Sequence, residues 1–383
     1  MKKQHIIREG FWALLRLLPI SLAKNNRFFF KFIPFHPTDA GLSVTNNCNS
    51  RCVHCLFWRC KSSNELSLYE IEDALIQLRE LGVFRITLTG GEPTLREDLP
   101  QIVKTCSDLK FTEVWLLTNG LLLDESLIKQ LLESGLTSIG VSIDGLEKTS
   151  DNLRGRKGDF KKAVSALGLL SELKQKEYHF LNVYIAMTLM KQNLSEVVPM
   201  ANLASELKVQ LCLCLIHSPL HTAPELKENA GDISLLHPLA DVTDLADLWI
   251  EDQLELDKVV DELHGIMKSK AKVFPFSHTH ASLEYLRRYF KDPKKADVPC
   301  IVGHNAIAIG AYGEVYPGCR LLGTVGNIRE TGLKEIVAST EYKRRLEAIF
   351  YKRCPRCSSN YNLNLWHYLP SIKDEIRFHV RKK

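Results

Sequence analysis

The sequence has 383 residues, of which 45% are hydrophobic and 25% are charged, and its formal net charge is +5. These proportions are typical of a globular protein and exclude a disordered chain or a fibre. The length suffices for one large α/β domain with a smaller module.

The first 36 residues form a basic, apolar segment. Seven Lys or Arg residues stand there against a single acidic residue, Glu9, so the segment carries a net charge of +6. Large apolar residues recur at helical spacing and lead into a run of phenylalanines. Arg16 interrupts the longest apolar run, which argues against a membrane span, and the segment does not end in a small-residue cleavage site, which argues against a signal peptide. Two interpretations stay open: a helix packed against the rest of the protein, and a helix lying on a membrane surface.

From Leu42 onward, short apolar runs alternate with helical patterns. This rhythm is typical of consecutive βαβ units in a parallel sheet. The expected strands cover residues 42–45, 84–89, 113–118, 138–143, 181–189 and 209–215. The expected helices cover residues 68–81, 98–107, 124–133, 159–173 and 194–207. The pattern predicts an α/β fold, a partial (β/α)6 parallel barrel whose strand ends meet at one mouth.

Three cysteines follow the first expected strand with the spacing C-x3-C-x2-C: Cys48, Cys52 and Cys55. Three thiolates on one loop can bind three irons of a cubane cluster and leave the fourth iron open to a small molecule. A zinc site completed by His54 or Cys60 is the alternative. His54 adjoins Cys55, and neighbouring side chains in an extended loop point apart, which disfavours a shared metal ion.

A Gly90-Gly91-Glu92-Pro93 motif follows the second expected strand. Two glycines let the backbone approach a ligand closely, and the carboxylate of Glu92 can pair with an ammonium group. Asn119 precedes a glycine after the third strand, where turn formation is a competing explanation. Because parallel strands end at the same edge, these motifs are expected to converge.

In order and spacing, residues 42–215 resemble the radical S-adenosylmethionine superfamily. The resemblance implies that a 4Fe-4S cluster is bound by Cys48, Cys52 and Cys55. It also implies that the methionine end of S-adenosylmethionine is contacted by Gly90, Gly91, Glu92 and Pro93. Asn119 and Ser142 stand where the family places further polar contacts, and Arg154 stands where the cofactor carboxylate would be reached. The implied reaction is reductive cleavage to a 5'-deoxyadenosyl radical.

A second group of four cysteines lies near the C-terminus: Cys300, Cys319, Cys354 and Cys357. With the glycine-rich segments between them, they resemble the SPASM and twitch extensions of the same superfamily. That resemblance implies a second, fully ligated 4Fe-4S cluster. Gly318 lengthens the usual glycine-to-cysteine interval by one residue. A zinc site and a metal-free module remain alternatives.

The remaining four cysteines carry no ligand spacing: Cys60, Cys106, Cys212 and Cys214. We expect them to be small buried hydrophobic residues. An odd total of eleven cysteines indicates thiols rather than a disulfide framework, and hence a cytoplasmic protein.

The chain is expected to divide into five segments. They are a basic amphipathic segment (1–40), a radical S-adenosylmethionine core (41–216), a mostly helical linker (217–299), an auxiliary-cluster domain (300–360) and a tail (361–383). Within the auxiliary domain we expect a β-hairpin over 306–316 and one helix over 333–349.

The leading functional hypothesis is a maturase-like radical enzyme acting on a peptide or small metabolite, with an external one-electron donor of the flavodoxin or ferredoxin type. A radical enzyme that modifies a lipid or isoprenoid at a membrane surface, reached through residues 1–36, is the second hypothesis. A non-catalytic iron–sulfur or zinc protein is the third. No nucleic-acid partner is expected, because the basic excess lies in an apolar arm rather than along a groove.

Overall fold

A computed structural model describes residues 15, 18–55, 57–59, 64–216, 245–269, 280–292, 300–351 and 353. Nine strands of these residues form one sheet in the order β6-β5-β4-β3-β2-β1-β7-β8-β9. The first six strands are parallel to one another. They are β1 (Asp39–Thr45), β2 (Arg85–Gly90), β3 (Glu113–Thr118), β4 (Ser138–Ser142), β5 (Asn182–Leu189) and β6 (Gln210–Leu215).

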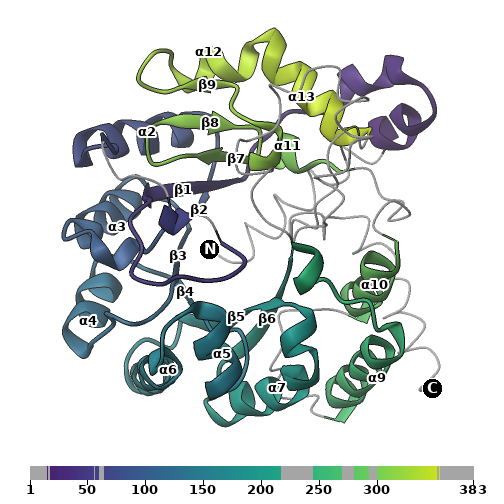
Figure 1. Cartoon of the computed structure of the whole chain (residues 1–383). Helices are drawn as coiled ribbons and strands as arrows, with labels where there is room; N and C mark the ends of the chain where they lie inside the picture. The colour runs from purple at the N-terminus through teal and green to yellow at the C-terminus, as the bar shows by residue number, and fades with distance from the viewer. Residues whose placement is uncertain are drawn as a thin grey trace, which may run out of the picture.

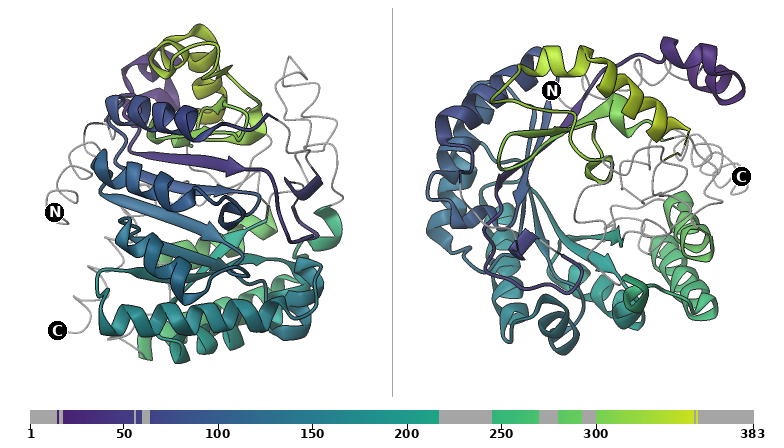
Figure 2. Two further views of the ribbon diagram at one scale, coloured as in Figure 1. Left: turned by 90° about the vertical axis from the view of Figure 1, so that its left-hand side faces the viewer. Right: turned by 45° about the horizontal axis from the view of Figure 1, so that its top comes forward.

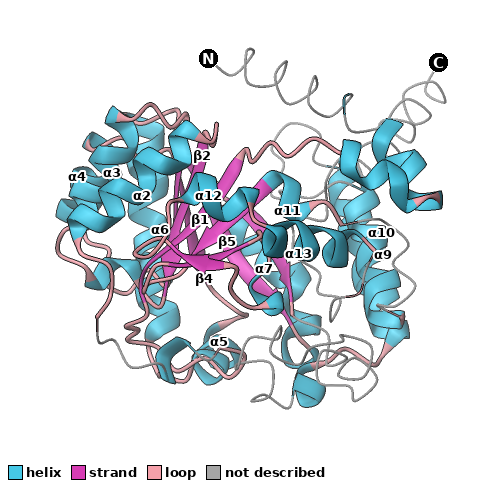
Figure 3. Ribbon diagram, turned by 90° about the horizontal axis from the view of Figure 1, so that it is seen from above, coloured by secondary structure: helices cyan, strands magenta, loops and turns pink. Residues whose placement is uncertain are grey.

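Helices separate these strands and cover the convex face of the curved sheet (Figure 1). They are α2 (Leu68–Glu80), α3 (Leu99–Asp108), α4 (Glu125–Glu133), α5 (Glu147–Arg154), α6 (Asp159–Lys176) and α7 (Val197–Glu206). The sheet does not close on itself, because β6 and β9 stand at opposite ends of the strand order. The expected α/β fold with a partial parallel barrel is therefore confirmed, and Figure 3 shows the helices arranged around the strands.

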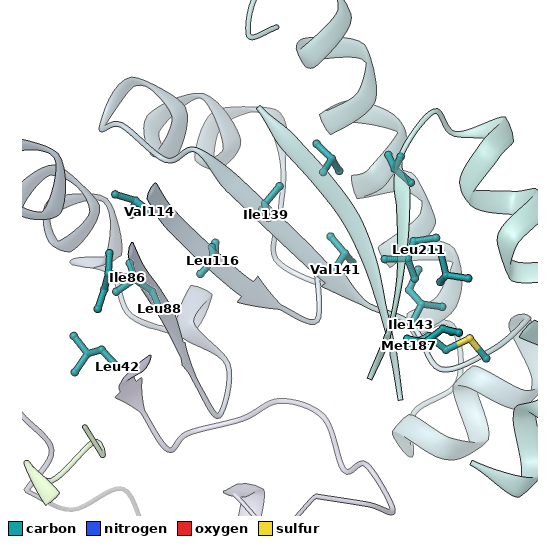
Figure 4. Close-up of a cluster of buried hydrophobic side chains, with 14 of the residues drawn as sticks. Leu42, Ile86, Leu88, Val114, Leu116, Ile139, Val141, Ile143, Met187 and Leu211 are labelled. Atoms are coloured by element: carbon teal, nitrogen blue, oxygen red, sulfur yellow. The ribbon is translucent and has the colours of Figure 1, made fainter. Parts of the chain in front are cut away.

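The main core lies between the sheet and these helices. Alternate strand residues point to the helices, and the side chains labelled in Figure 4 belong to this layer. Among them Ile86, Leu116 and Val141 are completely buried. Because side chains alternate along a strand, the intervening residues face the concave side.

Charged and aromatic side chains occupy the concave face at the amino ends of the strands. Arg85 lies between two carboxylates, 2.6 Å from Asp39 and 2.7 Å from Glu113. The rings of Trp115 and Tyr184 pack nearby, with their centroids 6.0 Å apart. The opposite, carboxyl ends of the strands carry the motifs found in the sequence.

The C-terminal segment extends the same sheet. β7 (Ala306–Ile309) pairs parallel with β1, and β8 (Glu314–Tyr316) and β9 (Gly326–Asn327) continue antiparallel. The expected β-hairpin is confirmed. The expectation of one helix over 333–349 is wrong, because α12 (Leu333–Ala338) ends at Ser339, whose hydroxyl caps α13 (Thr340–Phe350).

Part of the expected helical linker is described. It contains η8 (Leu245–Leu248), α9 (Gln253–Ser269) and α10 (His280–Lys291). The two long helices pack together, and Arg287 of α10 contacts Asp261 of α9 at 2.5 Å. The domain boundaries drawn from the sequence stay predictions.

The N-terminal segment packs beside α13, as the two views of Figure 2 show. Residues 18–25 are helical, and the 3-10 helix η1 (Arg27–Phe32) follows. Ile20, Ala23 and Ile33 are buried in a small cluster with Ile301 and Phe350. One side of the segment is therefore packed against the protein. Within the described residues, no helix has the length and apolar character needed to cross a membrane.

Candidate active site

The loop that carries Cys48, Cys52 and Cys55, called the cysteine loop below, follows β1, and two hydrogen bonds to Glu65 fix its beginning. The carboxylate of Glu65 accepts hydrogen bonds from the hydroxyl of Thr45, at 2.8 Å, and from the backbone N–H of Asn46, at 2.7 Å. Both contacts restrain the chain just before Cys48. The sequence did not indicate this role for Glu65, because Thr45 and Glu65 lie 20 positions apart in the chain.

The loop is also tied to the C-terminal end of α5. The backbone N–H groups of Arg51 and Val53 donate to the carbonyls of Arg154, at 3.0 Å, and Leu153, at 2.9 Å. These bonds satisfy carbonyls that a helix end leaves without partners. Gly155 follows with φ of +76°, and a Cβ atom there would lie 2.6 Å from the Arg51 carbonyl oxygen. The close approach of helix and loop therefore requires glycine at 155.

The three thiols of the loop lie in one partly buried environment. The pKa of Cys52 is raised to about 12, chiefly by burial; the guanidinium of Arg154 lowers it, and Asp144 and the other two cysteines raise it. Burial also raises the pKa of Cys48, whose sulfur accepts a 3.4 Å hydrogen bond from the N–H of Ser50. Arg154 therefore partly offsets the effect of burial and favours the thiolate forms of Cys48 and Cys52, which metal ligation needs.

The chemistry of this donor set fits an iron–sulfur cluster. Three cysteines on the loop after β1, in one partly buried environment, can supply one thiolate to each of three irons of a cubane. The residues present at Cys48, Cys52 and Cys55 therefore fit a cluster.

The glycine pair of the Gly90-Gly91-Glu92-Pro93 motif brings two strand ends into contact. A Cβ atom at Gly90 would lie 2.1 Å from the carbonyl oxygen of Thr45, and one at Gly91 would lie 2.1 Å from that of Asn47. The N–H groups of Gly91 and Glu92 donate to those two carbonyls at 2.7 and 2.6 Å. The glycines therefore seat the end of β2 against the base of the cysteine loop.

Glu92 is the buried polar centre of the site. Its carboxylate is 1% exposed and accepts hydrogen bonds from four donors. Thr94 supplies its N–H and hydroxyl, Thr118 its hydroxyl at 2.6 Å, and Asn119 its N–H at 2.7 Å. The side chain thus joins the ends of β2 and β3. Pro93 is buried and begins the 3-10 helix η3 (Pro93–Leu95).

Asn119 connects β3 to the cysteine loop. Its amide nitrogen donates to the side chains of Asn49, at 2.6 Å, and Ser50, at 3.0 Å. Its amide oxygen accepts from the N–H of Leu121, as expected of a turn. Ser142 ends β4 and is partly exposed. The cofactor contacts predicted for Asn119 and Ser142 stay predictions.

A buried ion pair between Arg154 and Asp144 lies next to Cys52. Arg154 Nη1 lies 2.8 Å from a carboxylate oxygen of Asp144, and the two side chains are 11% and 1% exposed. The second oxygen of Asp144 accepts from the N–H of Thr188 at 2.8 Å. Arg154 is therefore held between Asp144 and the thiol of Cys52, whose charges both act on it. The sequence did not predict the helix α5 or the ion pair between Arg154 and Asp144.

The C-terminal cysteines are described in part. Cys300 and Cys319 pack in one apolar cluster with Val302 and Ala306. Gly318, with φ of +68°, turns so tightly that a Cβ atom there would lie 2.8 Å from the carbonyl oxygens of both Val302 and Ala306. The extra glycine thus forms a tight turn directly before Cys319. Ligation by Cys300 and Cys319 stays a prediction, and the predicted ligands Cys354 and Cys357 lie outside the described residues.

The remaining cysteines differ in burial. Cys106 is completely buried in α3, as expected. Cys212 and Cys214 are partly exposed on β6, where the intervening Leu213 is buried. They therefore face the concave side of the sheet, and the expectation that they are buried hydrophobic residues is wrong. Cys60 lies outside the described residues.

A partial parallel barrel with three cysteines on its first loop defines the class of radical S-adenosylmethionine enzymes. Residues 42–204 match the model of the radical SAM superfamily, and residues 300–358 match that of an iron-sulfur cluster-binding domain, SPASM. Residues 42–204 therefore form a domain of the radical SAM superfamily, and a SPASM domain follows it near the C-terminus. Its cofactor class is accordingly S-adenosylmethionine with a 4Fe-4S cluster and an auxiliary iron–sulfur cluster.

Named relatives share these features over different lengths. The sporulation killing factor maturation protein SkfB of Bacillus subtilis is 36% identical over 162 residues, which is 42% of this chain and 38% of that protein. The AdoMet-dependent heme synthase of Methanosarcina barkeri is 27% identical over 79% of this chain and 82% of that protein. The chain therefore spans less than half the length of SkfB.

A solved structure supports the fold. SuiB of Streptococcus suis bound to S-adenosylmethionine superposes with a TM-score of 0.62 and 17% identity. The match covers 82% of this chain and 68% of that one.

Proposed function

We propose that the chain generates a 5'-deoxyadenosyl radical from S-adenosylmethionine and uses it to remove a hydrogen atom from a peptide or small metabolite. The observation that carries the proposal is the joining of three strand ends around the cysteine loop. Glu92 joins β2 to β3, Asn119 joins β3 to the loop, and Asp144 holds the arginine that ends α5. A site of this kind holds its ligands in place before they react.

Each group has a proposed task. Cys48, Cys52 and Cys55 would hold the cluster, which when bound supplies the electron that breaks a carbon–sulfur bond of S-adenosylmethionine. Backbone groups of the motif from Gly90 to Pro93, with Asn119, Ser142 and Arg154, would orient the cofactor. Glu92 would act through its four protein donors rather than by direct charge pairing, because those donors already occupy hydrogen-bonding positions of its buried carboxylate.

The concave face supports a substrate that enters over the strand ends. The part of this face near the carboxyl ends of the strands carries uncharged side chains from several strands: Thr89, Leu117, Ser142, Thr188 and Cys214. The charged Arg85 network lies at the other end. An uncharged wall excludes water without binding a fixed charge, which suits radical chemistry on an unactivated C–H bond. Of the matched relatives, one is named for peptide maturation and one for heme synthesis, and both substrate classes enter the proposal.

The proposed partners follow from the chemistry. The cluster would need an external one-electron donor of the flavodoxin or ferredoxin type. Cys300, Cys319, Cys354 and Cys357 would bind the auxiliary cluster, as an electron conduit or a structural support. We further propose a cytoplasmic location, in keeping with the odd total of eleven cysteines, and peripheral contact with a membrane through residues 1–36.

The test is anaerobic reconstitution with iron and sulfide, followed by dithionite and S-adenosylmethionine and an assay for 5'-deoxyadenosine. Wild type is expected to form 5'-deoxyadenosine, and Cys52→Ala is expected to form none. Cys106→Ala is the matched control, because Cys106 is buried in α3 and is expected to leave the product unchanged. A wild-type protein that contains its clusters and forms no product would favour the non-catalytic alternative.

A further inference from the structure

The N-terminal segment has two apolar sides, and only one of them is packed. Ile20, Ala23 and Ile33 form the buried side, at 5% exposure or less. The other side carries five large exposed residues: Leu15 (42%), Leu18 (68%), Leu22 (38%), Phe28 (58%) and Phe32 (52%). Packing against the protein therefore explains why the residues on the buried side are apolar. It does not explain the five large apolar residues that are exposed.

The exposed residues include two pairs of neighbouring side chains. Leu18 and Leu22 are four residues apart in the helix, which places them on one face. The rings of Phe28 and Phe32 in η1 lie side by side, with their centroids 5.7 Å apart. The side chain of Asn26 accepts from the N–H of Phe28 at 2.9 Å and so fixes the bend between the two helical parts. The segment lies at one corner of the molecule, beside α13 (Figure 1).

Basic side chains accompany the exposed residues. Lys24, Arg27 and Lys31 are exposed on the same short segment, and residues 10–38 contain no acidic residue. The ammonium of Lys31 lies 3.9 Å from the ring centroid of Phe28 and 5.2 Å from that of Phe32. In the part of the chain that the structure describes, Glu347 of α13 is an acidic group that faces the segment, and it contacts both Arg27, at 3.9 Å, and Arg353, at 3.1 Å.

We propose that this surface, formed by Leu15, Leu18, Leu22, Phe28 and Phe32 with Lys24, Arg27 and Lys31, docks on an anionic lipid bilayer. The aromatic and aliphatic side chains enter the interface between headgroups and acyl chains. The lysine and arginine side chains extend along these apolar groups and keep their charges at the level of the lipid phosphates. The segment lies on the membrane and does not cross it.

The positive charges of this surface favour an anionic lipid bilayer over a second copy of this chain as its binding partner. In a twofold dimer the same patch faces itself, so that Lys24, Arg27 and Lys31 would meet their own counterparts and repel them. An anionic bilayer instead offers a continuous negative surface to all three. The proposal is independent of the radical reaction, because docking needs none of the cysteines.

The experiment is co-sedimentation of the full-length reconstituted protein with two kinds of vesicles. One kind is pure phosphatidylcholine, and the other contains one quarter phosphatidylglycerol. We expect binding to the anionic vesicles and little to the neutral ones. The double variant Phe28→Ser/Phe32→Ser is expected to bind at least about tenfold more weakly, and Lys31→Glu is expected to lose most of the dependence on phosphatidylglycerol.

Matched controls separate docking from misfolding and dimerisation. Phe180→Ser removes an aromatic side chain of similar exposure (55%) outside the segment and is expected to bind like wild type. Thermal unfolding of Phe28→Ser/Phe32→Ser is expected to match wild type, because both rings are exposed. Wild type that fails to sediment with anionic vesicles, or a double variant that binds equally well, overturns the proposal. A dimer in sedimentation velocity that the double variant dissociates assigns the surface to a second copy instead.

Discussion

The guanidinium of Arg154 lies 2.8 Å from the carboxylate of Asp144, and both side chains are buried beside Cys52. The same arginine accepts a hydrogen bond through its backbone carbonyl from Arg51 of the cysteine loop. Arg154 therefore supports the loop with its backbone and places a positive charge next to the thiols with its side chain.

Asp144→Asn is expected to destabilise the protein strongly, because it leaves the charge of Arg154 buried without its counter-charge. We expect a loss of about 3 kcal/mol in the free energy of unfolding, measured by urea denaturation of the cluster-free protein. Asp108→Asn disrupts the exposed pair of Asp108 with Lys104 and is expected to cost about 0.5 kcal/mol or less. Equal effects of the two variants would show that the buried pair contributes no more than a surface pair.

Gly91→Ala is expected to prevent the first cluster from loading. The new methyl group would lie 2.1 Å from the carbonyl oxygen of Asn47 and push the cysteine loop away from β2. The iron content after reconstitution is expected to fall by about half, since one of two four-iron clusters is lost. Gly168→Ala in α6 is the control, because a Cβ atom there meets nothing within 4 Å, and it is expected to add about 0.5–1 kcal/mol of stability. Unchanged iron in Gly91→Ala would contradict the proposed role of the glycine.

Gly318→Ala is expected to act on the auxiliary site alone. In the Cys52→Ala background only the second site can hold a cluster, and the methyl group at 318 would collide with the carbonyls of Val302 and Ala306. We expect the iron that remains in this background to disappear, as read from the visible absorption of the cluster. Gly265→Ala, with open space around its Cβ position, is the control and is expected to retain that iron. Retained absorption in Gly318→Ala would contradict ligation by Cys319.

Arg329→Met is expected to remove a pH-dependent contact between the C-terminal segment and α2. Arg329 contacts the Glu70 carboxylate at 2.6 and 3.1 Å, and with Ser67 it lowers the pKa of Glu70 from its usual 4.5 to about 2. A carboxylate with a lowered pKa stabilises the fold above its unfolded pKa, and the gain is lost as pH falls from about 4.5 to about 2.

The difference in unfolding free energy between wild type and Arg329→Met is therefore expected to fall by about 1 kcal/mol between neutral pH and the lower limit. The part that remains comes from the hydrogen bonds of Arg329 to the carbonyls of Asn64 and Glu65, which do not titrate. Urea unfolding across this pH range measures the difference. Arg288→Met, at an exposed arginine of α10, is the control. A difference that stays constant with pH would exclude Glu70 as the responsible group.

Much of the fold was predictable, because it depends on repeating patterns. The strand β3 was predicted at its observed bounds, and the other five strands of the core within a few residues. Hydrophobic alternation and the glycine after a strand depend on local backbone geometry, which neighbouring residues encode. The boundary between α12 and α13 at Ser339 was not predicted, because the sequence pattern does not distinguish a serine that caps a helix from a serine on a helix surface.

The sequence by itself determined the family, the order of the strands along the chain and the side chains available for metal ligation, since these depend on residue type and spacing. Only the tertiary structure decided which groups meet at the strand ends. Glu92 receives donors from Thr118 and Asn119, and Asp144 receives Arg154 and Thr188. Such contacts join residues 10 to 44 positions apart in the chain, and they form because parallel crossovers bring all the carboxyl ends of the strands to one edge.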